Sequence, residues 1–428
     1  LCTPMQTFII LVFVLGYLAI VLEHPLKINK SASALLTGVL VWAIWIMMQT
    51  GDKELVTEAL DHHLGSTAGI LFFLMAAMTI VELIDAHDGF TIITSAIRTR
   101  KKSTLLWIVC FLSFFLSAVL DNLTTTIVMV SLSRKLLQNQ EDKMLFAGMI
   151  VIAANAGGAW SPIGDVTTTM LWIGGQISSA SIIAGLFIPS VICMLIPLTV
   201  AAFRLKGDVE VTGQVAATDH VSSTTQRERN TVFFVGVGTL LFVPVFKSIT
   251  HLPPFMGILF GLGCLWAVVE YIHRRKDDQQ KEYYSATKAL QRIDTPSMLF
   301  FLGILLAISA LESTGMLAQL AQAMNDRIGN LPVIVTGIGL LSAIVDNVPL
   351  VAASMGMYDL TTYPMDHFLW EYMAYCAGTG GSILIIGSAA GVAAMGMEKI
   401  SFIWYLKKIS LYALMGYLGG AAVYILLH

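Results

Sequence analysis

Long apolar runs alternate with short polar segments along almost the whole chain. Ten of these runs are about as long as a helix that crosses a bilayer, which needs roughly 20 residues. Two further apolar stretches, 104–136 and 332–355, are each interrupted near the middle by an Asp-Asn pair. The pattern predicts an all-α polytopic membrane protein with spans at about 5–22, 31–48, 67–84, 144–174, 181–203, 231–247, 255–272, 296–311, 368–397 and 409–427.

The composition agrees with this prediction and removes other classes of protein. The 428 residues are 56% hydrophobic and 12% charged, which leaves too few polar side chains to cover a water-soluble globule. The net charge of −3 offers no basic surface for nucleic acid. No motif with the spacing of a resident metal site occurs, and we expect no cofactor. The expected surroundings are therefore a lipid bilayer.

The chain contains an internal repeat. Ser-Ala-Val-Leu-Asp-Asn at 117–122 recurs as Ser-Ala-Ile-Val-Asp-Asn at 342–347. In each half, a second motif of Gly-Gly, four residues, Ile-Gly and a polar residue follows, at 157–165 and at 380–388. The similarity extends upstream, where Ala34 to Trp45 resembles Gly257 to Val268 and Phe72-Phe73-Leu74 resembles Phe300-Phe301-Leu302. Self-similarity of this kind indicates a duplicated structural unit.

The repeat predicts three segments. The first inverted repeat covers 1–203 and holds five spans plus hairpin 104–136, a cytoplasmic linker covers 204–230, and the second inverted repeat covers 231–428 with five spans plus hairpin 332–355. If each Asp-Asn segment is re-entrant, each half crosses the membrane five times. Five is an odd number, so the two halves must be inverted relative to each other.

The positive charges agree with this topology, because lysine and arginine concentrate in cytoplasmic loops. With 85–103 in the cytoplasm, 22 of the 25 lysines and arginines lie on that side, and the exceptions are Lys53, Lys247 and Arg327. Both termini are then external. The first hairpin opens from the cytoplasm and the second from outside.

Polar and glycine-rich residues at membrane depth indicate where the function lies. An ionised residue there costs roughly 2.5–3.5 kcal/mol on insertion scales, and non-helical backbone is tolerated only in a cavity or inside protein. We expect helix breaks at Gly157, Gly158, Pro162, Gly164, Gly380, Gly381 and Gly387. Oxygen ligands suit a small hard cation. The candidate ion-binding residues are Asp121, Asn122, Thr124, Asn155, Asp165, Thr167, Thr168, Ser342, Asp346, Asn347, Ser382 and Ser388.

Simpler roles are available for several of these residues. Asp121, Asp346 and Asp165 could cap the helices that follow them, Asn155 could join two helices, and Ser342 could bond a backbone carbonyl. A channel or a duplicated scaffold without transport would also show the repeat. An intramembrane aspartyl protease is disfavoured because 162–165 lacks the first glycine of the Gly-x-Gly-Asp motif, and we expect no enzyme.

The motifs at 121–126 and 155–168 together resemble those of the NhaD family of sodium/proton antiporters. The resemblance implies exchange of cytoplasmic Na⁺ or Li⁺ for external H⁺, a homodimer, a scaffold domain and a transport domain that holds the hairpins and broken helices. It also implies functional roles for Asp121, Asn122, Asn155, Asp165, Thr167, Thr168, Ser342, Asp346 and Asn347. A plasma membrane, the inner membrane of a bacterium, is the expected location.

The two halves of the repeat differ in two ways that affect ion binding. Asp165 of the first half is replaced by Ser388 in the second, so the two half-sites differ in charge, and Asp346-Asn347-Val348-Pro349 has no nearby threonine. We expect Na⁺ and H⁺ to compete for the same aspartates, with elevator-type alternating access. The alternative is a Na⁺-coupled dicarboxylate symporter of the same fold, although three carboxylates would repel a dicarboxylate.

Overall fold

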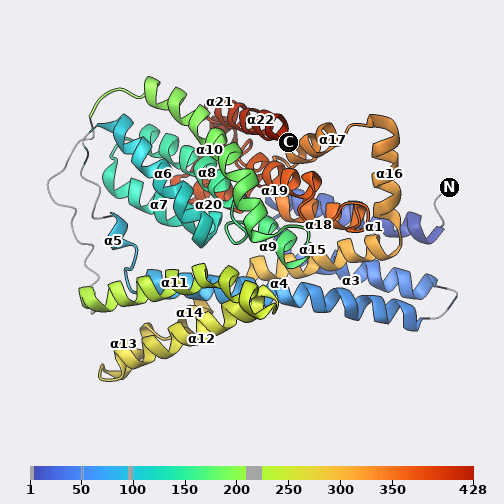
Figure 1. Ribbon diagram of the computed structural model, residues 1–428, viewed down its shortest axis with the longest axis horizontal. Coiled ribbons are helices and arrows are strands. Elements are labelled where there is room, and N and C mark those ends of the chain that lie inside the picture. Colours follow the sequence, from blue (N-terminus) through green and yellow to red (C-terminus); the bar gives the residue numbers. More distant parts are fainter. Residues whose placement is uncertain (1–3, 50, 52, 95–98, 100, 209–223) are drawn as a thin grey trace.

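The computed structural model describes all residues except 1–3, 50, 52, 95–98, 100 and 209–223, and those residues take in part of the predicted linker 204–230 and of loop 85–103 (Figure 1). Within the described part every element is a helix, apart from an isolated bridge between Lys101 and Asp208. Nine described helices are long and apolar enough to cross a membrane. The prediction of a polytopic all-α membrane protein is confirmed, whereas the inverted repeats and re-entrant hairpins stay predictions.

The helices form two layers (Figure 1). The unbroken-helix layer packs through the pairs α3 with α15, α1 with α3, α11 with α12 and α12 with α4. Its members are α1 (Pro4–Val21), α2 (Glu23–Leu26), α3 (Lys30–Met48), α4 (Glu54–Ala86), α11 (Gln226–Thr250), α12 (Pro254–His273), α13 (Asp278–Tyr283), α14 (Ala286–Arg292) and α15 (Thr295–Ser313).

The broken-helix layer packs through α6 with α8, α17 with α19 and α10 with α22. Its members are α6 (Lys102–Leu120), α7 (Asn122–Leu136), α8 (Gln140–Ala159), α9 (Val166–Ile173), α10 (Ser179–Arg204), α17 (Leu331–Leu341), α18 (Asn347–Met357), α19 (Phe368–Gly380), α20 (Ala389–Glu398), α21 (Phe402–Lys408) and α22 (Ser410–Leu427). The layers are joined by α5 (Thr91–Thr94) and α16 (Met316–Ile328). The pattern of apolar runs missed α16, because that helix is amphipathic and not apolar throughout.

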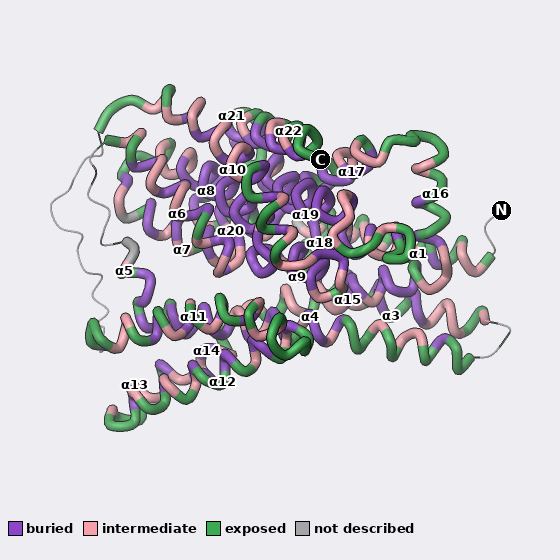
Figure 2. The backbone as a smooth tube through the Cα atoms, in the orientation of Figure 1, coloured by how far each residue is buried: buried purple, intermediate pink, exposed green. Residues whose placement is uncertain are grey.

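The predicted interruptions are confirmed. A single residue, Asp121, separates α6 from α7, and 342–346 separate α17 from α18. The predicted span 144–174 is two helices, α8 and α9, and 368–397 is likewise α19 and α20. Because α8 and α19 are buried along most of their length (Figure 2), both breaks lie inside the protein.

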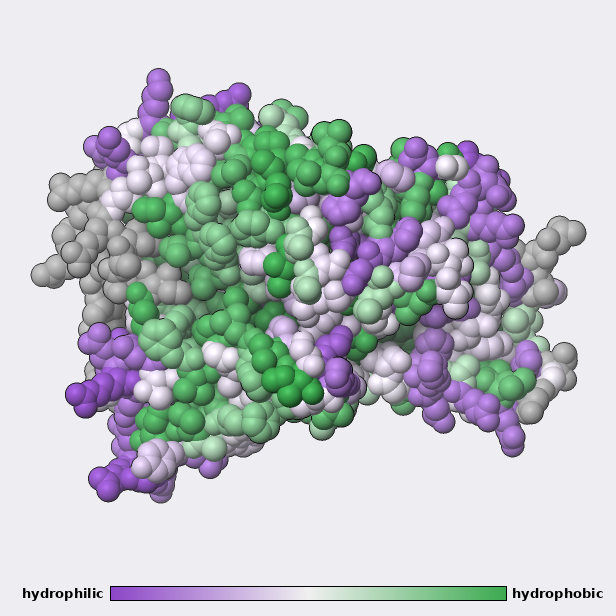
Figure 3. Space-filling model, in the orientation of Figure 1, coloured by the Kyte–Doolittle hydropathy of each residue, from purple (hydrophilic) through white to green (hydrophobic). Residues whose placement is uncertain are grey.

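The surface has the distribution expected of a membrane protein. Figure 3 shows a broad hydrophobic area over the middle of one face and polar residues towards both ends of the longest axis. Figure 1 places α5 and α13 at one end of that axis and α16 with the N-terminus at the other. Segments that the charge pattern predicts to share one side of the membrane therefore lie at the same end.

Close backbone contact between α3 and α15 holds the unbroken-helix layer together. A Cβ atom on Gly38 would lie 2.6 Å from the carbonyl oxygen of Gly303, and one on Gly303 would lie 2.5 Å from the backbone of Ala34 and Leu35. Backbone cannot move aside as a side chain can. Both positions therefore require glycine.

A buried histidine pair lies where α4 and α12 end. His87 Nδ1 is 2.6 Å from the Leu83 carbonyl oxygen, and His87 Nε2 is 2.8 Å from His273 Nε2. A carbonyl only accepts, so Nδ1 of His87 carries the proton, and in the neutral ring Nε2 accepts from His273. The Tyr284 ring packs on both imidazoles. Burial lowers the pKa of His87 to about 4, which leaves this ring neutral at pH 7.

We predict that Gly303→Ala lowers the melting temperature of the detergent-solubilised protein, because overpacking typically costs about 1–3 kcal/mol. Gly263→Ala is the matched control, since a Cβ at Gly263 of α12 would meet nothing within 4 Å. It should leave the melting temperature unchanged or raise it. Equal effects of the two substitutions would contradict the proposed contact.

We also predict that stability falls as the pH is lowered from about 6.5 to 4. In this range the unfolded chain protonates His87 while the folded chain does not, which costs up to about 1.4 kcal/mol per pH unit. Melting curves at pH 7.5 and 5 should differ less for His87→Gln than for the wild type. His62→Gln, at an exposed position of α4, should keep the wild-type pH dependence.

Candidate functional site

Asp165 lies at the centre of the candidate site, at the start of α9. Its side chain is 2% exposed and its backbone is extended, with φ −146°. Asp165 Oδ1 accepts hydrogen bonds from the backbone N–H and the hydroxyl of Thr167, both at 2.9 Å. The Thr168 hydroxyl donates to the Asp165 carbonyl oxygen. The carboxylate therefore caps α9, as the simpler interpretation of the sequence proposed.

Capping is only part of its environment, because two asparagine amides also point at Asp165. Asn122 Nδ2 donates to Asp165 Oδ2 at 2.5 Å. Asn347 Nδ2 lies 3.4 and 3.5 Å from the two carboxylate oxygens. These asparagines begin α7 and α18, so both Asp-Asn segments of the repeat meet at one carboxylate.

Asn155 extends this network to the second helix break. Its Oδ1 accepts from Asn122 at 3.0 Å, and its Nδ2 donates to the hydroxyls of Ser382 and Ser388 at 2.8 and 3.0 Å. Ser388 also caps α20 by accepting from the Gly391 N–H. The structure thus brings together residues from α7, α8, both breaks and α18 into one buried polar network.

Asp121 lies beside this network but is bound differently. Its carboxylate accepts from the Thr124 N–H at 2.8 Å and from the Thr124 hydroxyl at 2.9 Å. Its backbone has φ 76° and ψ 161°, a conformation almost restricted to glycine that costs roughly 1–3 kcal/mol. Strain of this kind persists only where the surroundings enforce it.

Asp346, the equivalent of Asp121 in the repeat, has ordinary backbone geometry, with φ −50°. Its Oδ1 accepts from the Val348 N–H at 3.3 Å. Its Oδ2 lies 3.2 Å from Lys30 Nζ on α3. All three aspartates therefore cap a helix, but Asp165 also accepts from asparagine amides and Asp346 also pairs with a lysine.

The glycines at the breaks allow helices to touch. A Cβ on Gly157 would lie 2.1 Å from the Phe114 carbonyl oxygen, and one on Gly380 would lie 2.0 Å from that of Gly339. Ser342 donates to the Ala377 carbonyl oxygen at 2.8 Å, as Ser117 does to Ala154 in the first half. Gly158, Pro162, Gly164, Gly381 and Gly387 also lie in or beside the two breaks.

Three cavities reach the site. A chamber of about 70 Å³ is lined by Asp121, Asn122 and Asp165 together with side chains of α4 and α15. A larger cavity of about 460 Å³ reaches Thr124 and is lined by Glu82, Asp85 and Arg292 among others. A third, of about 520 Å³, contains Lys30 and Asp346 in its wall. The small chamber has room for one ion and a water molecule.

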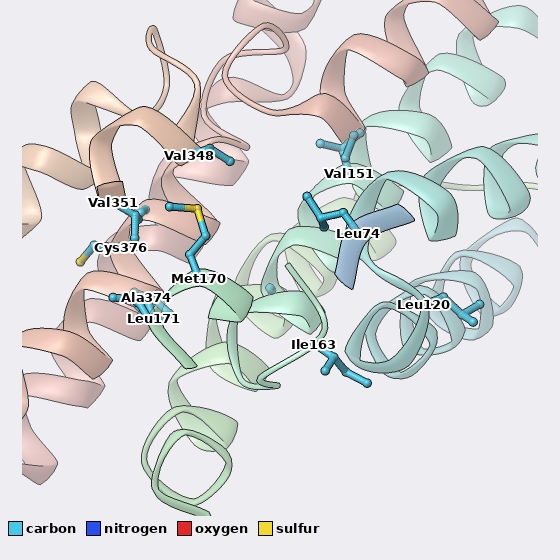
Figure 4. Close-up of a cluster of buried hydrophobic side chains, with 14 of the residues drawn as sticks. Leu74, Leu120, Val151, Ile163, Met170, Leu171, Val348, Val351, Ala374 and Cys376 are labelled. Atoms are coloured by element: carbon cyan, nitrogen blue, oxygen red, sulfur yellow. The ribbon is translucent and has the colours of Figure 1, made fainter. Parts of the chain in front are cut away.

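Packed apolar side chains surround the network. Figure 4 shows Met170 and Leu171 of α9 beside Val351 of α18 and Ala374 and Cys376 of α19. All five residues are buried. Their packing keeps α9 fixed against the second half and leaves the polar groups little access to water other than through the cavities.

The arrangement suits a small monovalent cation. Asp165 and Asp121 supply carboxylate oxygens, and the asparagines, threonines and serines supply amide and hydroxyl oxygens. Among the described residues no three histidine, cysteine, aspartate or glutamate side chains gather in the manner of a divalent metal site. Na⁺ and H⁺ are both ions that such oxygens can hold.

Four charged residues were not among the predicted site residues: Lys30, Glu82 and Arg292 line the larger cavities, and Glu371 is buried in α19. Lys30 was counted only as a charge at a membrane surface. Glu82 of α4 accepts from Arg292 at 3.4 Å in the wall of the cavity of about 460 Å³. Glu371 is 4% exposed and accepts from the hydroxyls of Ser181 and Tyr424. No local signal identifies these partners, since each comes from a distant helix.

The sequence is similar to those of known membrane transporters. The sequence model of the citrate transporter family (CitMHS) matches residues 17–378. Sodium/proton antiporter 1 of Arabidopsis thaliana is 51% identical over 98% of this chain and 72% of its own length. Sodium/proton antiporter 2 of the same plant is 48% identical, over 98% and 99%. The Na⁺/H⁺ antiporter NhaD of Vibrio cholerae is 30% identical, over 98% and 91%.

We predict that Asn155→Ala lowers the melting temperature, because it removes partners from Asn122, Ser382 and Ser388, and an unsatisfied buried polar group costs about 1–3 kcal/mol. Gln322→Ala, at an exposed position of α16, should change stability by less than about 0.5 kcal/mol. Wild-type melting of Asn155→Ala would show that the network contributes little to the fold.

Proposed function

The chain belongs to the NhaD-type sodium/proton antiporters, within the wider family of the citrate transporter model, and we propose that it exchanges Na⁺ for H⁺ across a membrane. The proposed direction is cytoplasmic Na⁺, or Li⁺, outward and external H⁺ inward. The family consists of transporters, in agreement with the prediction that this chain is not an enzyme. The observation that carries the proposal is the chamber between two carboxylates, Asp121 and Asp165.

Both ions can use one site because they stabilise the same carboxylates in opposite protonation states. Burial disfavours an ionised carboxylate and raises its affinity for a proton, whereas a bound cation favours the ionised form. A site that accepts either Na⁺ or H⁺, and not both, exchanges the two ions when it faces the two sides in turn.

The carboxylates of the site also make the alternative, a Na⁺-coupled dicarboxylate symporter, the weaker proposal. The family model is named for citrate, a multivalent anion. Here Asp121, Asp165 and Asp346 all lie in or beside the site, and Asn122 and Asn347 already direct their amide donors at Asp165. A polyanion would meet like charges where it needs donors. The sodium/proton exchange of the named relatives fits these residues better.

We propose elevator-type movement of the broken-helix layer against the other layer. The repeat makes α7 the equivalent of α18 and α4 the equivalent of α15. Although α18 packs along α15, α7 makes sparse contact with α4, and the cavity of about 460 Å³ lies between them. Such an asymmetry is expected when the site is open to only one side of the membrane. Exchange of the two arrangements between the repeats would open the other side.

The multi-pass membrane location is supported by the apolar helices and the family. The bacterial inner membrane stays a prediction, because the relatives near 50% identity come from a plant and those near 30% from bacteria. The homodimer and the transport of Li⁺ likewise stay predictions.

The experiment that tests the function uses proteoliposomes with an acid interior and a fluorescent amine as reporter. We expect external Na⁺ to collapse the pH gradient with saturation. Labelled succinate should not accumulate in a Na⁺-dependent way. Succinate uptake without Na⁺-driven collapse of the gradient would overturn the proposal in favour of the symporter.

We predict that Asp121→Asn and Asp346→Asn each abolish Na⁺-driven collapse of the gradient, because neither amide can alternate between a proton and a cation. Asp359→Asn is the control. Asp359 is exposed in the segment after α18, where it accepts from Thr361 and Thr362. Wild-type exchange by either site variant would remove that aspartate from the mechanism.

A further inference from the structure

The Lys30–Asp346 ion pair joins the two layers. Lys30 is the first residue of α3 in the unbroken-helix layer, and Asp346 caps α18 in the broken-helix layer. Their charged atoms are 3.2 Å apart, and Lys30 Nζ also lies 4.4 Å from the centre of the Phe300 ring on α15. The pair therefore exists only while the layers have the relative position seen here.

Lys30 is held firmly on its own layer. The Lys30 N–H donates to Glu23 Oε1 at 3.1 Å, and the next residue, Ser31, donates its hydroxyl to the Pro296 carbonyl oxygen at 2.6 Å. Asn29 caps the helix by accepting from the Ser31 N–H. Movement of α18 relative to α15 would thus carry Asp346 away from Lys30 and would not pull Lys30 along.

Asp346 is within reach of ions. The pair lies in the wall of the cavity of about 520 Å³, which is also lined by Tyr17, Glu23 and Lys27. Its side chains are 27% and 18% exposed, so water and cations can approach the carboxylate. An ammonium group, a Na⁺ ion and a proton each neutralise one negative charge, and they compete for the same oxygens.

The equivalent aspartate has no such partner. In the repeat, Lys30 corresponds to Pro253, which carries no charge. Among the described residues, Asp121 has no ion pair, and its carboxylate accepts from Thr124 instead. The lysine is therefore a feature of one half-site, and its role is specific to one position of the layers.

From these observations we infer that Lys30 is a tethered cation that retains the unloaded transporter in the conformation seen here. The layers separate at this point only after Na⁺ or H⁺ has replaced Lys30 at Asp346. Return of the empty, deprotonated site is thereby suppressed, which makes exchange obligatory. This inference rests on the proposed function, and it adds a positioning residue that acts through Asp346.

The test compares Lys30→Met with Lys30→Arg and with Lys27→Met, which removes a lysine from the same cavity without touching the pair. We expect Lys30→Met to lower the half-saturating Na⁺ concentration about fivefold, the equivalent of about 1 kcal/mol for a partly exposed ion pair. It should also let the pH gradient decay without Na⁺, because empty sites return. Lys30→Arg and Lys27→Met should behave as the wild type. Wild-type half-saturation and a stable gradient in Lys30→Met would overturn the inference.

A second measurement does not depend on transport. Val392 of α20 lines both larger cavities. In a background without other reactive cysteines, Val392→Cys should react with a soluble maleimide at high pH without Na⁺, and more slowly when Lys30→Met or Lys30→Gln is added. Equal labelling rates would contradict the role of Lys30. Slower labelling together with no Na⁺-driven proton movement in the wild type would instead refute the proposed function alone.

Discussion

A carboxylate that is buried at membrane depth must be compensated, and the architecture around Asp165 supplies that compensation. Its oxygens receive a backbone N–H and a hydroxyl from Thr167 and amide groups from Asn122 and Asn347. No single helix can deliver these donors. A broken α8–α9 helix and an interruption before α7 and before α18 bring them to one point, so the helix breaks follow from the need to satisfy this charge.

The same constraint explains why the three aspartates differ. Asp121 is stabilised by the start of α7 at the expense of a strained backbone, Asp165 by neutral amides, and Asp346 by Lys30. Neutral amides leave a carboxylate free to take up a cation or a proton. A lysine must first be displaced. The site therefore combines groups that bind ions with Lys30, which disfavours a change of conformation while the site is empty.

Much of this could be predicted from the sequence, because glycine pairs and Asp-Asn pairs interrupt apolar runs that otherwise give unambiguous helices. The breaks between α8 and α9 and between α19 and α20 fall at the predicted Gly-Gly motifs. The repeat also indicated that Asn122 and Asn347 belong to one site. The contact of both with Asp165 required the packed structure.

The remaining features depend on partners far apart in the chain. Lys30 looks like an ordinary surface charge until α3 is placed beside α18. Glu371 lies in the predicted span 368–397, and its partners Ser181 and Tyr424 come from α10 and α22. The amphipathic α16 carries no apolar run long enough to predict a span. Local patterns identify helices and breaks, but they cannot identify which helices meet.

Competition of Na⁺ and H⁺ for one set of carboxylates can be tested through the half-saturating Na⁺ concentration as a function of pH. In proteoliposomes with the pH equal on both sides and labelled Na⁺ exchange as the readout, we expect this concentration to rise up to about tenfold per unit decrease in pH. The maximal rate at saturating Na⁺ should stay constant. A half-saturating concentration that is independent of pH, with a maximal rate that falls instead, would show that the two ions bind at separate sites and do not compete.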